Sequence, residues 1–145
     1  MMPAASKPGP AGRMAVLRCN EALRLVGTVP LGRVAFTDRA LPAIRPVNRL
    51  MDAGEIIVRT HGGSALLGRA PASEVVAYEA DEIGPITRTS WSVVVTGTAT
   101  RVADAGELAR YQRPLVAWFD AAMGQVVRIQ PEIVSGVRLT RVGRS

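Results

Sequence analysis

The chain has 145 residues, of which 48% are hydrophobic, so it is long and apolar enough for one folded domain and is not an intrinsically disordered chain. Its net charge of +6 comes from scattered arginines, and only 4% of its residues are aromatic, so neither a dense basic run nor a base-stacking platform indicates a nucleic-acid partner. A single cysteine and the absence of any apolar run that could cross a bilayer predict a soluble cytoplasmic protein with no membrane contact.

The first segment in chain order, residues 1–13, is rich in proline, glycine, alanine and serine and has no periodic apolar pattern. We expect it to be a flexible tail, followed by a single domain over residues 14–145. Met14 is a second candidate for the natural start of the chain.

A short amphipathic helix is predicted next, over residues 17–27, because Gly27 can serve as its C-terminal stop. Cys19 shares one stripe of this helix with Ala22 and Val26. A small thiol on an apolar stripe is typical of the core, so we expect Cys19 to be buried and structural.

Extended segments joined by tight turns follow the helix. Connections this short allow only antiparallel neighbours, because a parallel crossover needs a dozen residues or more. The pattern therefore predicts an antiparallel meander. Its strands are expected at 32–37, 41–48, 55–60 and 74–79, with turns at 38–40 and 52–54.

The longest strand is predicted from Trp91 to about residue 102, where alternate side chains fall on opposite faces of an extended chain. Asp104 and Glu107 then have the spacing of a capping box, which predicts a helix that stops before Pro114.

The remaining elements are a short helix at 64–67 and two final strands at 126–129 and 135–140. The total of six or seven strands with short helices predicts a mainly β fold. A closed or partly closed antiparallel barrel is the architecture that this total favours.

One corner of the predicted meander is suited to binding an anion. A strand ends there, two glycines allow unusual backbone dihedrals, and a hydroxyl residue begins a helix, so free N–H groups and the positive end of a helix dipole point at one spot. An arginine adds a two-pronged contact, which suits a terminal phosphate. A helix cap with a solvated arginine is the alternative interpretation. The corner consists of Arg59, Thr60, His61, Gly62, Gly63 and Ser64.

Two further features have both a binding and a structural interpretation. Pro46 lies inside a strand pattern, so its strand is expected at an edge or a bulge, where free backbone groups could meet a planar ring. An edge that simply avoids aggregation explains the same proline. Trp91 suits core or interface packing, with ring stacking as the alternative.

Metal and triad chemistry are excluded by composition. His61 is the only histidine and Cys19 the only cysteine, so no zinc cluster can form. A Ser-His-Asp triad would have to use His61, which lies in a glycine-rich loop without a nucleophile motif, and we interpret it as a loop residue.

Five segments in order resemble the flavin-binding split-barrel proteins related to pyridoxamine 5'-phosphate oxidase, in particular their short actinobacterial and nitroimidazole-reductase-like branch. The resemblance implies a six-stranded antiparallel split β-barrel that forms a homodimer, with two flavins bound at the subunit interface. The segments are GRVAF at 32–36, LPAIRPVN at 41–48, VRT-x-GGS at 58–64, WSVVVTG at 91–97 and VRIQPEIVSG at 127–136.

The resemblance also implies which residues bind the cofactor, although it assigns no catalytic residue. Arg59, Thr60 and Ser64 would hold the flavin phosphate, and the stretch Arg45, Pro46, Val47 and Asn48 would run along the isoalloxazine ring. Trp91 and Ser92 would approach from the partner chain, and Arg128 would line the substrate side.

One position departs from the family pattern. Ala65 stands where family members commonly have a lysine directly after the serine of the phosphate loop. The missing charge-assisted contact is worth about 1.5–3 kcal/mol, which corresponds to roughly tenfold to a hundredfold in affinity. Arg69, one helical turn further on, is a candidate for partial compensation.

By resemblance, we expect an FMN-dependent oxidoreductase that acts on a small organic substrate, with NAD(P)H as a candidate reductant. A deazaflavin (F420) enzyme of the same fold and a non-enzymatic flavin or ligand binder are the alternatives. Oxidation of pyridoxamine phosphate itself is not expected, because the longer arginine-rich substrate loops are not evident. Asp81 and Glu82 are expected in a solvated loop.

Overall fold

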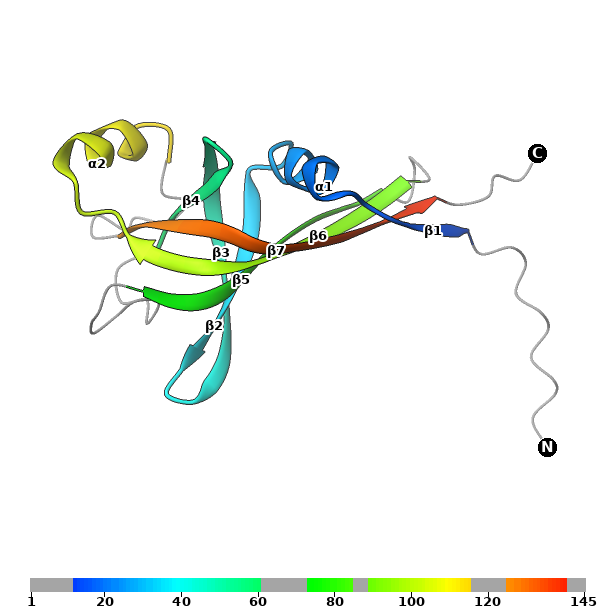
Figure 1. The fold of residues 1–145 in the computed structure, drawn as a ribbon, viewed down its shortest axis with the longest axis horizontal. Coiled ribbons are helices and arrows are strands. Elements are labelled where there is room, and N and C mark those ends of the chain that lie inside the picture. Colours follow the sequence, from blue (N-terminus) through cyan, green and yellow to red (C-terminus); the bar gives the residue numbers. More distant parts are fainter. Residues whose placement is uncertain (1–11, 61–72, 85–88, 116–124, 141–145) are drawn as a thin grey trace.

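The structure is a computed structural model that describes residues 12–60, 73–84, 89–115 and 125–140, drawn as a coloured ribbon in Figure 1. The predicted helix at 64–67 and nearly all of the predicted tail lie outside the described residues. The strands are β1 (Arg13–Val16), β2 (Leu31–Asp38), β3 (Leu41–Asp52), β4 (Glu55–Arg59), β5 (Ser73–Ile83), β6 (Thr89–Arg101) and β7 (Val126–Thr140), and the helices are α1 (Cys19–Val26) and α2 (Ala105–Gln112).

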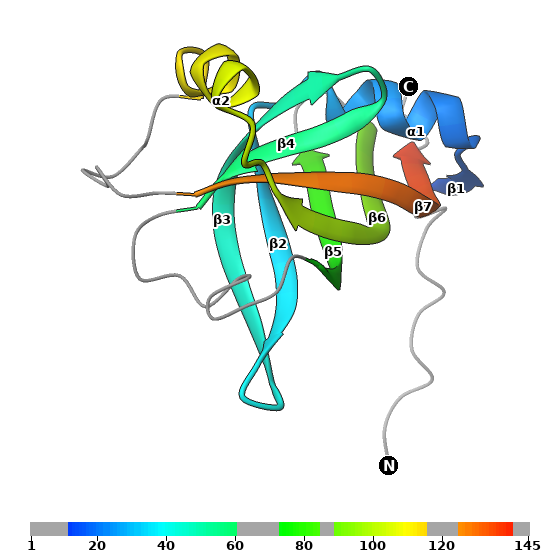
Figure 2. The ribbon, with the colours of Figure 1, turned by 60° about the vertical axis from the view of Figure 1, so that its left-hand side comes forward.

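Six strands close into an antiparallel barrel, as predicted. The order around the ring is β7-β4-β3-β2-β5-β6, and β6 closes it by pairing with β7. Figure 2 shows these strands arranged around a common centre, with α1 and α2 over different parts of the ring. The seventh strand, β1, pairs with the C-terminal part of β7, and it begins at Arg13, the last residue of the predicted tail.

The barrel interior holds the main hydrophobic core. Along β6, every second residue from Trp91 to Ala99 is buried and the residues between these are partly exposed, so the predicted alternation is confirmed. Val34 of β2 and other apolar residues from β3, β4, β5 and β7 join the same cluster. Alternation along each strand therefore separates an inner face from an outer face all round the ring.

Helix α1 is held to the barrel by one arginine as well as by its apolar stripe. Ala22 and Val26 of the helix are buried in the main core. The Nε atom of Arg49 on β3 donates to the carbonyls of Val26 at 3.0 Å and Val29 at 2.8 Å, and its Nη2 donates to that of Gly27 at 2.6 Å. These carbonyls belong to the end of α1, where helical partners are lacking, so Arg49 serves as a C-terminal cap from another element.

The prediction of a buried Cys19 is wrong, because this residue is exposed. Helix α1 begins at Cys19, two residues later than predicted, and its first turn lies beyond the core. The stripe was identified correctly, since Ala22 and Val26 are buried, but burial starts only at its second turn.

The two predicted final strands are one continuous strand, β7. Pro131 lies between the two predicted strands, at a register shift in which Thr96 faces Ile133 but Gly97 faces Pro131, so Glu132 is an extra residue at a bulge. A bulge accommodates a proline because it already lacks a regular ladder hydrogen bond.

Strand β5 is longer than predicted and runs to Ile83, so Asp81 and Glu82 lie in a strand and not in a loop. In the described ranges, no helix is both long enough and apolar enough to span a membrane.

Candidate functional site

One group of predicted site residues, 45–48 together with 59 and 60, falls on both faces of the β3–β4 hairpin and its end. Asn48 of β3 lies opposite Arg59 of β4, and on its other side Arg59 lies opposite Val126 of β7. Val58 is fully buried in the barrel core, so its neighbour Arg59 points to the outer face, together with Asn48. Thr60 returns to the inner face and is only 5% exposed.

Arg59 is partly held and partly unpaired. Its Nη1 donates to the main-chain carbonyl of Leu115, just beyond α2, at 3.1 Å. Its Nε is buried and has no hydrogen-bond partner among the described residues. Leaving a buried charged donor unsatisfied is costly, so the arrangement indicates that an acceptor from outside the described protein atoms belongs here.

Thr60 is bound to Gln125, a residue that the sequence did not single out. The Thr60 amide donates to the Gln125 carbonyl at 2.8 Å, and the Gln125 amide donates to the Thr60 hydroxyl oxygen at 3.2 Å. The side-chain oxygen of Gln125 is buried and unpartnered within the described structure. No local signal marks Gln125, because it meets Thr60 only through the pairing of the last strand with β4.

Two polar atoms near the end of β4 are therefore unpaired among the described residues. The donor, Arg59 Nε, lies on the outer face, and the acceptor, Gln125 Oε1, belongs to the next residue pair, with Thr60. A phosphate ester complements the outer donor, since its phosphate oxygens accept. The residues present thus fit such a ligand. His61, Gly62, Gly63, Ser64 and Ala65, the rest of the predicted phosphate corner, lie outside the described residues, as does Arg69.

The prediction that Pro46 lies at a strand edge is confirmed. Strand β4 pairs with β3 only from Asn48 onward, so in the described structure residues 41–47 pair on one side alone, with β2. Pro46 is exposed there, whereas Val47 is buried in the main core. The guanidinium of Arg45 donates to the carbonyl of its own neighbour Ile44 at 2.9 Å, so Arg45 faces solvent at this edge.

Trp91 and Ser92 point in opposite directions. Trp91 is 5% exposed and belongs to the main core of its own chain, which is the packing interpretation of this residue. Ser92 lies on the outer face, opposite Asp81 of β5 and Val137 of β7. The contact of either residue with a flavin stays a prediction.

Arg128 contacts three side chains of its own chain, and its predicted role on the substrate side stays a prediction. Its Nε lies 3.1 Å from a carboxylate oxygen of Glu55, and its Nη2 contacts the Glu107 carboxylate. The same Nη2 donates to the hydroxyl of Tyr111 at 3.3 Å. Tyr111 and Glu107 belong to α2, so Arg128 of β7 ties that helix to the barrel.

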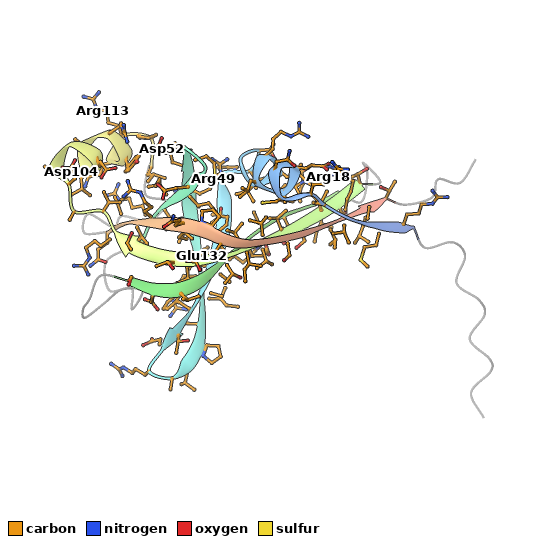
Figure 3. The ribbon with its side chains drawn as sticks, viewed as in Figure 1. Arg18, Arg49, Asp52, Asp104, Arg113 and Glu132 are labelled. Atoms are coloured by element: carbon orange, nitrogen blue, oxygen red, sulfur yellow. The ribbon has the colours of Figure 1, made fainter. Side chains whose placement is uncertain are left out.

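Tyr111 is also contacted by a second arginine, Arg110, and by a third carboxylate, that of Asp52. The Tyr111 hydroxyl donates to Asp52, and Arg110 Nη2 lies 3.0 Å from both that hydroxyl and the Asp52 carboxylate. Figure 3 shows Asp52 beside α2, at the end of the β3–β4 hairpin. We call Asp52, Glu55, Glu107, Arg110, Tyr111 and Arg128 the α2 clasp.

Contacts within the α2 clasp favour the protonated form of its two arginines. The hydrogen bond to Tyr111 is the largest cause that raises the pKa of Arg128, and the Glu107 and Glu55 carboxylates raise it further. The same tyrosine raises the pKa of Arg110. Both arginines therefore stay protonated at neutral pH.

A separate depression of about 450 Å³ lies at the start of α1 and is lined by Arg18, Asn20, Glu21 and Arg24. None of these four residues is a predicted site residue. The depression lies along the N-cap and first two turns of α1 and shares no lining residue with the end of β4.

Comparison with known proteins gives consistent matches. The sequence pattern of the family described as pyridoxamine 5'-phosphate oxidase matches residues 19–138. The uncharacterized protein Rv0080 of Mycobacterium tuberculosis is 49% identical over 144 residues, covering 97% of this chain and 95% of that protein.

Two solved structures share the fold at 30% sequence identity. One, from Corynebacterium glutamicum, has the provisional name pyridoxamine 5'-phosphate oxidase, with a TM-score of 0.74 over 95% of this chain and 100% of that chain. The other is the FAD-binding protein of Mycobacterium smegmatis, with a TM-score of 0.69 over 86% of this chain and 97% of that chain.

Proposed function

The chain belongs to the pyridoxamine 5'-phosphate oxidase family, and we propose that it binds a flavin phosphate, FMN, at the end of β4 and serves as an oxidoreductase for a small organic substrate. The observation that carries the proposal is the buried, unpartnered Nε of Arg59 in the described structure. A similar structure is that of an FAD-binding protein, which supports a flavin as the ligand.

The residues at this site have separable tasks. Arg59 supplies charge-assisted donors to the phosphate, and its existing bond to the Leu115 carbonyl uses only one of its five N–H groups. Asn48 and Pro46 lie along the same outer face, where a flat ring can rest against β3.

When bound, a flavin supplies hydride or electron transfer, and the protein supplies orientation and electrostatics. On the outer face, the cation of Arg59 lies opposite Asn48, two residues from the exposed Pro46, so the proposed site joins a charged end to an apolar strand edge. Such a boundary binds a molecule with an ionic phosphate and an apolar ring.

We also propose that the active form is a homodimer. A row of outward-facing residues crosses five strands, and its two ends, Ile44 and Ile133, are 61% and 65% exposed. Large exposed apolar side chains on one sheet face mark an interaction surface. The row consists of Ile44, Ala35, Ala77, Thr96 and Ile133, and it lies on the same sheet face as Asn48 and Arg59.

The cofactor is tested by titrating the purified protein with FMN, FAD, riboflavin and F420 and recording visible spectra. Saturable FMN binding that is tighter than riboflavin binding, with bleaching of the spectrum by NAD(P)H or a coupled reductant, supports the proposal. Tighter binding of F420 assigns a deazaflavin enzyme instead, and tight flavin binding without turnover assigns a binder. Failure to bind any of the four ligands overturns the flavin site.

The dimer is tested by light scattering during size-exclusion chromatography. Ile133→Asp places a charge on the outer row, so we expect a monomer with an unchanged far-UV circular dichroism spectrum. Met14→Asp, at an equally exposed position in β1, is the matched control and should remain a dimer. A monomeric wild type, or a dimer that tolerates Ile133→Asp, contradicts the proposed interface.

A further inference from the structure

We propose that the α2 clasp positions Arg59 for the phosphate, so that Tyr111 is a positioning residue for cofactor selection although it lies outside the end of β4. The inference rests on the proposed function, because it assumes a phosphate at Arg59. It adds a part of the molecule that the sequence resemblance did not assign, namely helix α2.

The first step in the argument is the contact between Arg59 and the residue just beyond α2. The Leu115 carbonyl accepts from Arg59 Nη1 at 3.1 Å, and the Leu115 amide is bonded to the Tyr111 carbonyl at 3.3 Å. The carbonyls at a helix end have no helical partner and carry the negative end of the helix dipole. Arg59 is thus fixed by a neutral acceptor that leaves its positive charge available to an anion.

The second step is that α2 packs on a small hydrophobic cluster of its own. Tyr111 and Leu115 are almost completely buried, and they pack in a second cluster outside the barrel. Because α2 is only eight residues long, it depends on tertiary contacts for its position. The other buried members of this cluster are Ile57, Val102 and Val126, with Leu50 and Leu108 at its margin.

The third step is that the tyrosine hydroxyl connects α2 to two parts of the barrel at once. It contacts Asp52 at the end of β3, and it accepts from Arg128 of β7 at 3.3 Å. The strands that carry these partners flank β4, which carries Arg59. A shift of α2 would therefore move the Leu115 carbonyl away from Arg59 while leaving the barrel itself closed.

An arginine side chain has many rotamers, and holding one of them in advance lowers the entropy lost on ligand binding. This entropic effect changes the affinity only of ligands that contact the arginine. Release of one such side chain weakens binding by about three- to tenfold. The α2 clasp should therefore change the affinity for FMN and leave the affinity for riboflavin, which has no phosphate, almost unaltered.

The experiment compares the dissociation constants of FMN and riboflavin, measured by quenching of flavin fluorescence, for wild type and Tyr111→Phe. The variant keeps the buried ring and removes only the hydroxyl. We expect the preference for FMN over riboflavin to fall by about three- to tenfold. Thr98→Val is the matched control, because it removes a hydroxyl that contacts the Glu132 carboxylate on another part of the barrel, and it should leave the preference unchanged.

Two further variants separate positioning from general stability. In an Arg59→Ala background, Tyr111→Phe should cause no additional loss of preference, because the residue through which it acts is gone. Asp52→Ala should repeat the effect of Tyr111→Phe. If the tyrosine variant does not fold, Asp52→Ala serves in its place, because the Asp52 side chain is 36% exposed and its truncation leaves the buried cluster intact. Asp52→Asn keeps an acceptor for the hydroxyl and should restore most of the preference.

The possible failures are distinguishable. A wild type that binds FMN and riboflavin equally overturns both the phosphate site and this inference. A wild type that prefers FMN, together with clasp variants that keep the full preference, overturns only the inference. Equal losses for both ligands in Tyr111→Phe also overturn it, because they indicate a purely structural role.

Discussion

Gly32 lies so close to the ring of Tyr78 that a Cβ atom at this position would be 2.1 Å from the tyrosine hydroxyl oxygen and 2.2 Å from the ring carbon that bears it. Tyr78 is completely buried in the barrel core and has little room to move. We therefore expect Gly32→Ala to lower the free energy of unfolding by about 3 kcal/mol, the upper end of the usual cost of overpacking. Urea denaturation measures the loss.

The matched control is Gly106→Ala in α2, where the nearest atom to the new Cβ is a carboxylate oxygen of Asp104 at 3.3 Å. Alanine favours a helix over glycine, so the expected change is within about 1 kcal/mol of zero. Similar losses in the two variants would show that the tyrosine ring adapts to the methyl group.

Burial raises the pKa of Tyr78 well above its ordinary value of 10.0. The unfolded chain therefore loses this proton first, and the stability of the fold decreases as pH rises above about 10. Tyr78→Phe removes this dependence, so between about pH 9.5 and 11 its free energy of unfolding should fall less than that of the wild type. Parallel curves in urea denaturation over that range would contradict the prediction.

The same variant has a second expected result near neutral pH. The Tyr78 hydroxyl is buried without a hydrogen-bond partner among the residues that the structure describes. Its removal should change the free energy of unfolding by less than about 1 kcal/mol, because no bond is lost. A larger loss would indicate that the hydroxyl is satisfied in solution.

Arg49 holds three carbonyls at the end of α1, so Arg49→Met should destabilise the protein by about 1.5–3 kcal/mol. Arg49→Lys should recover part of the loss, because an ammonium reaches one or two of these acceptors. Thermal unfolding followed by circular dichroism measures both. Arg24→Met, at an exposed position of the same helix, is the control and should cost less than about 0.5 kcal/mol.

Arg59→Ala should weaken FMN binding by roughly tenfold to a hundredfold, because a charge-assisted contact with the phosphate is lost, and should change riboflavin binding much less. Titrations followed by flavin fluorescence give both constants. Equal losses of affinity for FMN and riboflavin would show that Arg59 does not bind the phosphate.

The sequence predicted the fold well because the signals for it are local. Alternation along β6, the turn between β2 and β3 and the proline at position 46 each depend on a few neighbouring residues, and the structure places all three as expected. Asp104 also accepts from the Glu107 amide at 2.9 Å, as the capping pattern indicated. The carboxylate of Glu107, however, contacts Arg128 of β7.

That contact illustrates what the sequence could not predict. The α2 clasp brings together residues 52, 55, 107, 110, 111 and 128, and no short window of sequence contains more than three of them. Gln125 likewise becomes a neighbour of Thr60 only when the last strand enters the ring. Arg128 was singled out by resemblance, but its three partners could be known only from the closed barrel.

Strand β7 is the last of the described strands in sequence order, and it pairs with β4, β6 and β1. A nascent chain that lacks β7 exposes the unpaired edges of β4 and β6 at the same time, and such edges promote association between chains. The long-range pairing that completes the ring must wait until this segment has left the ribosome. Closure of the ring during synthesis is therefore delayed until β7 has emerged, and premature termination before residue 126 yields a product prone to aggregation.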